Sequence, residues 1–186
     1  MEKTDDITKL LEACKRKDQK AQMLVYKLYA KAMYHVALRI TGDIDDAEDV
    51  MQEAFIKAFD KLDTYKATAS FGAWLKRIVV NEALSWLRKH KKTTCLDDTE
   101  NPIEPEPDIE VDEKNMKIEV LLKAIDQLKD NYRVAINLYY IEGYDYDEMM
   151  QILNLSYANV RTLVSRAKQK LKSILETQYN DIIKET

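Results

Sequence analysis

All three prolines of this 186-residue chain fall in one acidic segment, and this feature constrains the fold more than any other. They are Pro102, Pro105 and Pro107. Nine acidic residues and no basic residue lie between Asp97 and Glu113. Prolines at this density exclude a helix, and like charges repel one another and extend a chain. We therefore predict an acidic, proline-containing linker over residues 93–115, between an N-terminal module (1–92) and a C-terminal module (116–186).

Both modules are predicted to be helical, so the expected fold is all-α with two small helical domains. The chain has only three glycines and three prolines, which leaves few residues that break helices or form tight turns. Apolar residues recur every four positions from Leu24 to Ile40, which predicts a long helix that ends at Gly42. Another long helix is expected over about 71–90. Four more are expected at about 114–129, 131–142, 145–153 and 156–176.

The net charge of −4 argues only weakly against a nucleic-acid partner. The nine acids between Asp97 and Glu113 account for this value, because without that stretch the chain holds 29 basic and 24 acidic residues, a net charge of +5. The charge asymmetry is therefore internal, with an acidic connector between two more basic modules.

Little in the sequence suggests metal, cofactor or catalytic chemistry. Cys14, Cys95, His35 and His90 lie far apart, so we expect no zinc site and no disulfide. Without a glycine-rich phosphate loop or a catalytic partner for either histidine, we expect no cofactor and no enzymatic activity. The first residues lack the apolar run of a signal peptide, and no window approaches the ~20 apolar residues of a membrane span. We therefore expect a cytoplasmic protein with no membrane insertion.

The stretch from Asp43 to Phe55 is an acidic helix with six acids and no base. Asp43 is a suitable N-cap for it. Its apolar residues recur at steps of three and four and should pack inward; they are Ile44, Ala47, Met51, Ala54 and Ala58. The polar residues should point away from that face; they are Asp45, Asp46, Glu48, Asp49, Gln52 and Glu53. The glycine and glutamate of a calcium-binding EF-hand loop are missing at the required positions.

A polar, basic strip is predicted along the helix at about 71–90. Its members fall at steps of four, four, three and four; they are Arg77, Asn81, Ser85, Arg88 and Lys92. The loop before it, Thr64 to Ser70, contains Tyr65 and Lys66. Such a loop beside a basic strip could hold unpaired bases by stacking and phosphate contact. The alternatives are a merely solvated face for the strip, and core packing for Trp74 and Trp86.

The stretch "DEMMQILNLSYANVRTLVSRAKQKLK" predicts a helix-turn-helix. Asn154 suits the left-handed position of the turn, and Ser156 suits the N-cap of the second helix. Five bases and no acid lie between Ser156 and Lys172, as expected for a helix that enters the major groove of DNA. The candidate contacts are Ser156, Tyr157, Asn159, Arg161, Thr162, Ser165, Arg166 and Lys168. A basic solvated helix of a bundle is the alternative.

Together these motifs resemble a bacterial RNA polymerase sigma factor of the extracytoplasmic-function (ECF) type. "ALRITGDIDDAEDVMQEAFIKAF" and "ASFGAWLKRIVVNEALSWLRK" are similar to sigma region two. "LKDNYRVAINLYYIEGYDYDEMMQILNLSYANVRTLVSRAKQKL" is similar to region four. The resemblance covers about 20–92 and 118–172. Met150 and Leu163 depart from the family pattern, which usually has a small residue and often an arginine there.

The resemblance implies how the chain acts. The acidic helix, through Asp49, Gln52 and Glu53, would bind core RNA polymerase. The loop before Trp74, with Asn81, would capture the melted downstream promoter element, and the helix from Ser156 would read the upstream element as duplex. The linker would enter the polymerase channels, and an anti-sigma factor is a further partner left open. The alternatives are a helix-turn-helix regulator that acts without polymerase, and a protein whose modules bind only protein.

Overall fold

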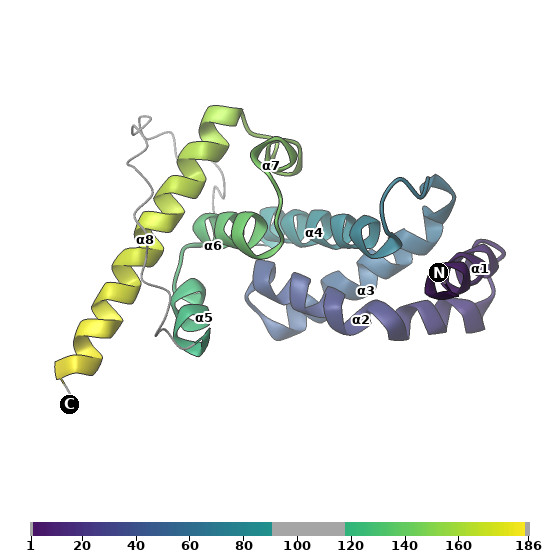
Figure 1. The fold of residues 1–186 in the computed structure, drawn as a ribbon, viewed down its shortest axis with the longest axis horizontal. Coiled ribbons are helices and arrows are strands. Elements are labelled where there is room, and N and C mark those ends of the chain that lie inside the picture. The colour runs from purple at the N-terminus through teal and green to yellow at the C-terminus, as the bar shows by residue number, and fades with distance from the viewer. Residues whose placement is uncertain (1, 91–117, 185–186) are drawn as a thin grey trace. The chain divides into compact units, whose positions relative to one another are not determined.

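The computed structural model describes residues 2–90 and 118–184, and every regular element within these ranges is a helix or helical turn (Figure 1). The expected all-α class is therefore confirmed for these residues. The chain divides into two units, Met1–Lys92 and Thr93–Thr186. The predicted linker, residues 93–115, lies outside the described residues.

The first unit is built on three long helices that pack against one another. Its elements are α1 (Glu2–Lys15), α2 (Gln19–Thr41), α3 (Ile44–Asp60), the 3-10 turn η1 (Leu62–Thr64) and α4 (Phe71–His90). Each pair among α2, α3 and α4 is in contact, and α1 lies against α2 and η1. The bounds of α4 are those predicted. The side chains at the centre of this core are Val25, Ile40, Ala47, Ala54, Leu75, Val79 and Ala83.

The turn between α2 and α3 forms as its residue types predict. Gly42 adopts the left-handed conformation (φ 74°), and its N–H donates to the carbonyl of Leu38 at 2.8 Å. The carboxylate of Asp43 accepts hydrogen bonds from the backbone N–H groups of Asp45 (2.9 Å) and Asp46 (3.1 Å). Such a cap stabilises a helix by about 1 kcal/mol. Both predicted caps are confirmed.

The row of apolar residues that predicts α2 does not form its buried face. Leu24 and Leu28 are 53% and 66% exposed, whereas Val25 and Met33 are buried. A step of four residues overshoots one helical turn by about 40°, so a row of four such steps winds around the helix by about 160°. The row correctly predicts a helix, but only its C-terminal end, near Ile40, faces the core.

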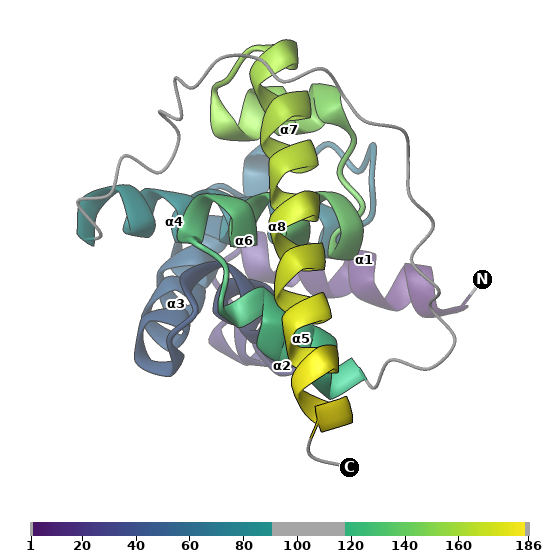
Figure 2. The ribbon, with the colours of Figure 1, turned by 90° about the vertical axis from the view of Figure 1, so that its left-hand side faces the viewer.

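The second unit packs around one long helix. Its elements are α5 (Ile118–Asp126), α6 (Asp130–Ile136), the π-helical turn η2 (Asn137–Ile141), α7 (Tyr146–Leu153) and α8 (Tyr157–Lys184). α5, α6 and α7 each contact α8, which Figure 2 shows along its length. The helix expected at 131–142 is present as α6 continued by η2. The central core side chains are Ala124, Leu138, Met149, Leu153, Val160 and Ala167.

Candidate functional site

The predicted acidic residues of α3 form a solvent-exposed surface. Asp45, Glu48, Asp49, Gln52 and Glu53 are exposed, and Asp46 is half-buried. Ala47, Met51, Ala54 and Ala58 are buried on the other side, as expected. Ile44 was expected to face inward, but this is wrong: as the first residue of α3, beside the turn, it is 60% exposed. We call the six polar residues the acidic face.

An isoleucine that the sequence interpretation missed accompanies the acidic face. Ile56 is 58% exposed and follows Gln52 by four residues, so the two side chains lie on the same side of α3. An apolar side chain beside carboxylates is a combination that protein interfaces use, because the one contributes burial and the others charge complementarity. The signal in the sequence is a lone isoleucine at helical spacing from acids.

Lys57 connects the acidic face to α4. Its ammonium lies 2.6 Å from Oε2 of Glu82 on α4 and 3.2 Å from Oε1 of Glu53 on its own helix. The hydrogen bond to Glu82 raises the pKa of Lys57, and the bond to Glu53 acts in the same direction, while burial opposes both. Glu82 is the only acidic residue of α4. Its charge is therefore compensated from the neighbouring helix.

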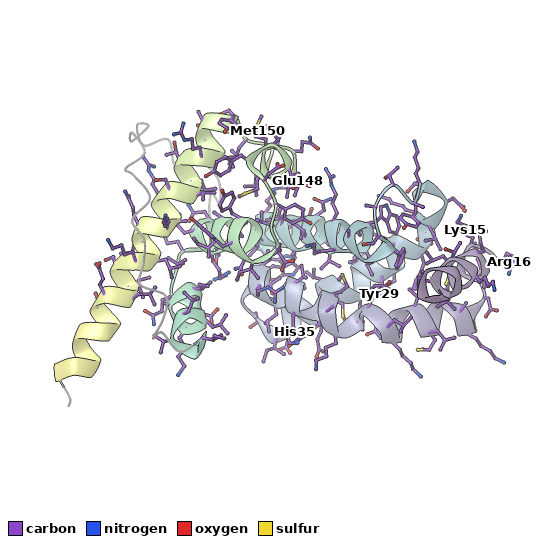
Figure 3. All side chains as sticks on the ribbon, viewed as in Figure 1. Lys15, Arg16, Tyr29, His35, Glu148 and Met150 are labelled. Atoms are coloured by element: carbon purple, nitrogen blue, oxygen red, sulfur yellow. The ribbon has the colours of Figure 1, made fainter. Side chains whose placement is uncertain are left out.

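Aromatic rings hold the loop that precedes α4. The hydroxyl of Tyr65 donates to the carbonyl of Ala69 at 2.7 Å. The Tyr65 ring lies 5.4 Å from that of Trp74 and 5.7 Å from that of Phe71. Tyr29 of α2, labelled in Figure 3, contacts Phe71 at 5.3 Å between ring centroids. The loop is thus built on a cluster of four rings.

Because Tyr65 and Trp74 belong to this cluster, only part of each ring is accessible to a ligand. Both side chains are half-buried, so each has one part in the cluster and another part at the surface. Lys66 is fully available on the exposed part of the loop, next to Ala67, which takes an unusual left-handed conformation (φ 55°). The residues from Lys66 to Ser70 are all exposed.

The polar strip on α4 is largely exposed. Arg77, Asn81 and Arg88 are exposed and Ser85 is half-buried, whereas Lys92 lies outside the described residues. Trp86 is not on this strip: its ring stacks on His90 at 4.6 Å, and it is half-buried. The strip begins at Arg77, about one helical turn after Trp74 of the aromatic cluster.

The helix-turn-helix forms with the predicted turn. Asn154 has left-handed dihedral angles (φ 57°, ψ 47°), and its N–H donates to the carbonyl of Met150. The hydroxyl of Ser156 accepts from the backbone N–H of Asn159 at 3.3 Å, which caps α8. Both predictions are confirmed. α7 also begins with a capping box between Asp145 and Glu148 that the sequence interpretation missed. Glu148 and the half-buried Met150 are labelled on α7 in Figure 3.

Most of the candidate contacts on α8 are accessible, but Arg166 is not. Ser156, Tyr157, Asn159 and Arg161 are exposed; Thr162, Ser165 and Lys168 are half-buried. Arg166 is only 9% exposed. Five residues separate it from Arg161, a rotation of about 140° around the helix, so the two cannot face one groove together. Leu163 is 7% exposed on the same buried side of α8. This side chain therefore packs in the core and is not available to contact DNA.

The accessible side of α8 forms a second strip with the spacing of the first. Tyr157, Arg161, Ser165, Lys168 and Lys172 follow one another at steps of four, four, three and four. This is also the spacing of the strip on α4. Val160 and Val164 are buried on the opposite side. The name α8 strip refers below to these five residues, and α4 strip to the five from Arg77 to Lys92.

A chain of tyrosine rings leads to the start of the α8 strip. Tyr139 of η2 stacks on Tyr146, the first residue of α7, with 4.9 Å between centroids and 15° between planes. Tyr146 in turn meets Tyr157, the first residue of α8, edge-to-face at 5.7 Å and 89°. Burial, and then a hydrogen bond with Tyr139, raise the pKa of Tyr146 to about 12, so its hydroxyl is protonated at neutral pH. Local sequence patterns gave no indication of this cluster.

The described residues show neither a metal-binding cluster nor a membrane-spanning helix. In residues 2–90 and 118–184 no three His, Cys, Asp or Glu side chains gather as a metal site would require. No helix in these ranges is both long enough and apolar enough to cross a membrane. Cys14 is buried, and burial, with the nearby charge of Asp18, raises the pKa of its thiol.

Comparisons with known proteins agree with the arrangement of the two units. Residues 25–93 match the family model of Sigma-70 region 2, and residues 118–171 match that of Sigma-70 region 4. Among solved structures, the sigma factor RpoE from Bartonella quintana, in complex with the anti-sigma factor NepR, has a TM-score of 0.57 and 26% identity. The match covers 83% of this chain and 96% of that one. CnrH, in complex with the cytosolic domain of CnrY, shares the fold at a TM-score of 0.54 and 22% identity, over 90% and 96% of the two chains.

Curated relatives match over nearly their full length. The ECF RNA polymerase sigma factor SigM of Bacillus subtilis is 32% identical over 164 residues, which cover 84% of this chain and 96% of SigM. The ECF RNA polymerase sigma-E factor of Escherichia coli K12 is 30% identical over 180 residues, or 90% and 92% of the two chains. Both family models lie in the order found in sigma factors. The chain therefore belongs to the ECF sigma factors, which bind core RNA polymerase and direct it to promoters to initiate transcription.

Proposed function

We propose that this ECF sigma factor divides its work among three surfaces. The acidic face of α3 contacts core RNA polymerase. The loop before α4 and the α4 strip hold the melted downstream promoter element, and the α8 strip reads the upstream element as duplex. The protein itself performs no chemistry, because the polymerase synthesises the RNA, and it acts in the cytoplasm. The observation that carries the proposal is the presence of two equally spaced polar strips on two separate units, with a separate acid-only surface.

The acidic face suits a protein partner rather than DNA. Its charged side chains are all negative, and Ile56 contributes an exposed apolar group beside them. A phosphate backbone would be repelled by such a surface, whereas a basic helix pair of the polymerase would be attracted to it.

The two strips suit different forms of DNA. The α8 strip begins at a capped helix N-terminus after a tight turn, as in proteins that place a helix in the major groove. The α4 strip instead follows an exposed loop with half-buried aromatic rings, which could stack on unpaired bases. Residues 1–92 and 116–186 would thus act as separate domains connected by the acidic segment 93–115.

An anti-sigma factor is a further proposed partner. The RpoE structure that is similar to this chain is a complex with an anti-sigma factor, and it matches over 83% of this chain. The exposed apolar residues of the first unit, among them Leu24 and Leu28 on α2, would be available to such a partner.

Charge reversal on the acidic face tests the polymerase assignment. The variant Glu48→Lys/Asp49→Lys changes two exposed acids and leaves Glu53 in contact with Lys57. Each new lysine would repel a basic partner, so affinity for core polymerase should fall by on the order of tenfold or more in a fluorescence titration. Asp60→Lys, an exposed acid at the end of the same helix, is the matched control and should bind normally. Unchanged affinity of the double variant at moderate salt would rule out this face as the polymerase contact.

A further inference from the structure

The tyrosines of the second unit come from three separate elements and converge on one end of α8. Tyr139 belongs to η2, Tyr146 begins α7 and Tyr157 begins α8. Tyr139 also meets Tyr140 edge-to-face, with 4.9 Å between their centroids. Tyr139 and Tyr146 are half-buried, whereas Tyr157 is 48% exposed. The cluster is therefore anchored inside the unit and open at Tyr157.

This arrangement restricts the ring of Tyr157. Edge-to-face contact with Tyr146 fixes one side of the ring, and Tyr146 is itself fixed by its stacking on Tyr139. Aromatic pairs in this geometry contribute about 0.5–1.5 kcal/mol beyond simple burial. A side chain that is already ordered in the free protein loses less conformational entropy when it binds a ligand. The exposed part of the Tyr157 ring is thus presented in one orientation, one helical turn before Arg161.

The chemistry of this position favours an apolar feature of a base over a phosphate. The nearest rings around Tyr157 are neutral tyrosines, and the basic side chains of the α8 strip begin at Arg161. The first turn of such a helix is the part that meets base edges in the major groove. Only thymine presents an apolar group there, the C5-methyl, and aromatic side chains are among those that contact it.

We propose that Tyr157 recognises a thymine of the upstream element through its C5-methyl group, and that Tyr146 is a positioning residue that holds the Tyr157 ring for this contact. The inference rests on the proposed assignment of α8 to the upstream duplex. It adds a base and a contact to that assignment, and it gives the tyrosine cluster a role.

Replacement of thymine by deoxyuridine tests the contact directly, because it removes only the methyl group. Duplexes selected by the holoenzyme from a pool randomised over the upstream element supply the probe. Each thymine is then replaced singly, and the affinity of the holoenzyme is measured. One replacement should weaken binding about fourfold, the effect expected for one lost methyl contact. In the Tyr157→Ala holoenzyme the same replacement should have no effect, and Tyr157→Phe should restore the wild-type response.

Three results would overturn the proposal. One is a selected sequence without thymine, and another is equal sensitivity to deoxyuridine in wild type and Tyr157→Ala. The third is a Tyr157→Phe variant that loses affinity equally for all duplexes, since this would indicate a phosphate contact by the hydroxyl. If the holoenzyme does not distinguish selected from scrambled upstream duplexes at all, the assignment of α8 fails instead, so the two failures are distinguishable.

Tyr146 is tested by its effect on discrimination rather than on affinity. Tyr146→Leu should abolish the difference between thymine and deoxyuridine while the salt dependence of binding, which reports phosphate contacts, stays as in wild type. Tyr146→Phe keeps the stacked ring and should keep the discrimination. Circular dichroism of both variants checks the fold. If Tyr146→Leu is folded and still distinguishes thymine from deoxyuridine, Tyr146 does not position Tyr157.

Discussion

The α4 strip and the α8 strip have the same spacing but different surroundings, and the surroundings distinguish what each can bind. Within the described residues, both place polar or basic side chains at steps of four, four and three along a helix, from Arg77 to Arg88 on α4 and from Tyr157 to Lys168 on α8. α8 begins directly after a tight left-handed turn and a serine cap, so its first residues project from the unit. α4 begins after an exposed loop that is held by aromatic rings. The spacing alone therefore predicts that each helix binds DNA. The segment that precedes each helix, a tight turn or an exposed loop, favours duplex DNA for α8 and unpaired bases for α4.

The two strips also differ in charge. From Ser156 to Lys172, α8 has no acid. α4 has one, Glu82, next to Asn81 in the sequence, and Lys57 of α3 compensates it at 2.6 Å. A duplex presents two charged backbones, and an acid beside it would be costly, whereas a surface for unpaired bases depends more on stacking. The comparison predicts base readout at the N-terminal end of α8, far from Glu176, which pairs with Lys172 at 3.7 Å. On α4 it predicts a compensated acid within the strip's own helix.

Arg161→Ala should have the largest effect, because Arg161 is the residue of the α8 strip that we propose for a base contact. A bidentate arginine–guanine pair contributes about 1–3 kcal/mol of discrimination against the wrong base. The variant should lose preference at one base pair in a binding series of duplex variants. Lys168→Ala is the matched control: it should weaken all duplexes alike and lower the salt dependence by about one unit. If Arg161→Ala loses affinity without relaxing any base preference, its role is electrostatic.

Asn81→Ala should impair open-complex formation, the step that we assign to the α4 strip, and not the initial binding of duplex DNA, which we assign to the α8 strip. The exposed amide of Asn81 can pair with a base edge only after melting. Loss of such a hydrogen bond costs about 0.5–1.5 kcal/mol. Permanganate footprinting should show fewer open complexes, while closed-complex binding stays near wild type. Equal losses in both complexes would mean that Asn81 has only a structural role.

The fold and part of these surfaces could be predicted from the sequence because they depend on local chemistry. Gly42, Asp43, Asn154 and Ser156 each act within a few residues of their own position, and all four have the predicted role. Helix caps and turns need no knowledge of the tertiary structure.

The errors and omissions have a common origin in three-dimensional packing. Arg166, a candidate contact, is buried because an interval of five residues from Arg161 rotates it by about 140° around α8. The row from Leu24 to Ile40 predicts a helix but not its buried face, because equal steps of four wind around α2. The ring contacts of Tyr146 with Tyr139 and Tyr157 join different elements, so the local spacing of residues does not predict them. Met150 and Leu163 could not be interpreted without the burial that the fold gives them.

Tyr65→Phe should have a smaller effect, confined to the α4 side of the comparison. It removes the hydroxyl that bonds to the carbonyl of Ala69 and keeps the ring in its cluster. An exposed hydrogen bond of this kind contributes about 0.5–1 kcal/mol. Open-complex formation should fall slightly, with unchanged binding of upstream duplexes. Tyr34→Phe on α2 is the control for loss of a tyrosine hydroxyl, and a similar fall in that variant would contradict the role of the loop.

Lys57→Met should have the smallest effect, a small loss of stability. The pH dependence of this loss tests whether the charge of Lys57 compensates Glu82 on α4, a compensated acid that the α8 strip does not have. The pKa of Lys57 is raised in the folded protein, first by the hydrogen bond to Glu82. Its stabilising contribution is therefore complete below the unfolded pKa of about 10.4 and is lost as the pH rises through the folded pKa. Because the ammonium is partly exposed and screened, the contribution at neutral pH should be only about 0.2–1 kcal/mol. Urea denaturation should show this difference from wild type at neutral pH, and the difference should shrink as the pH rises beyond the unfolded pKa of about 10.4, with the exposed Lys61→Met as control. A difference that persists at high pH would show that packing of the lysine stem, and not its charge, holds α3 against α4.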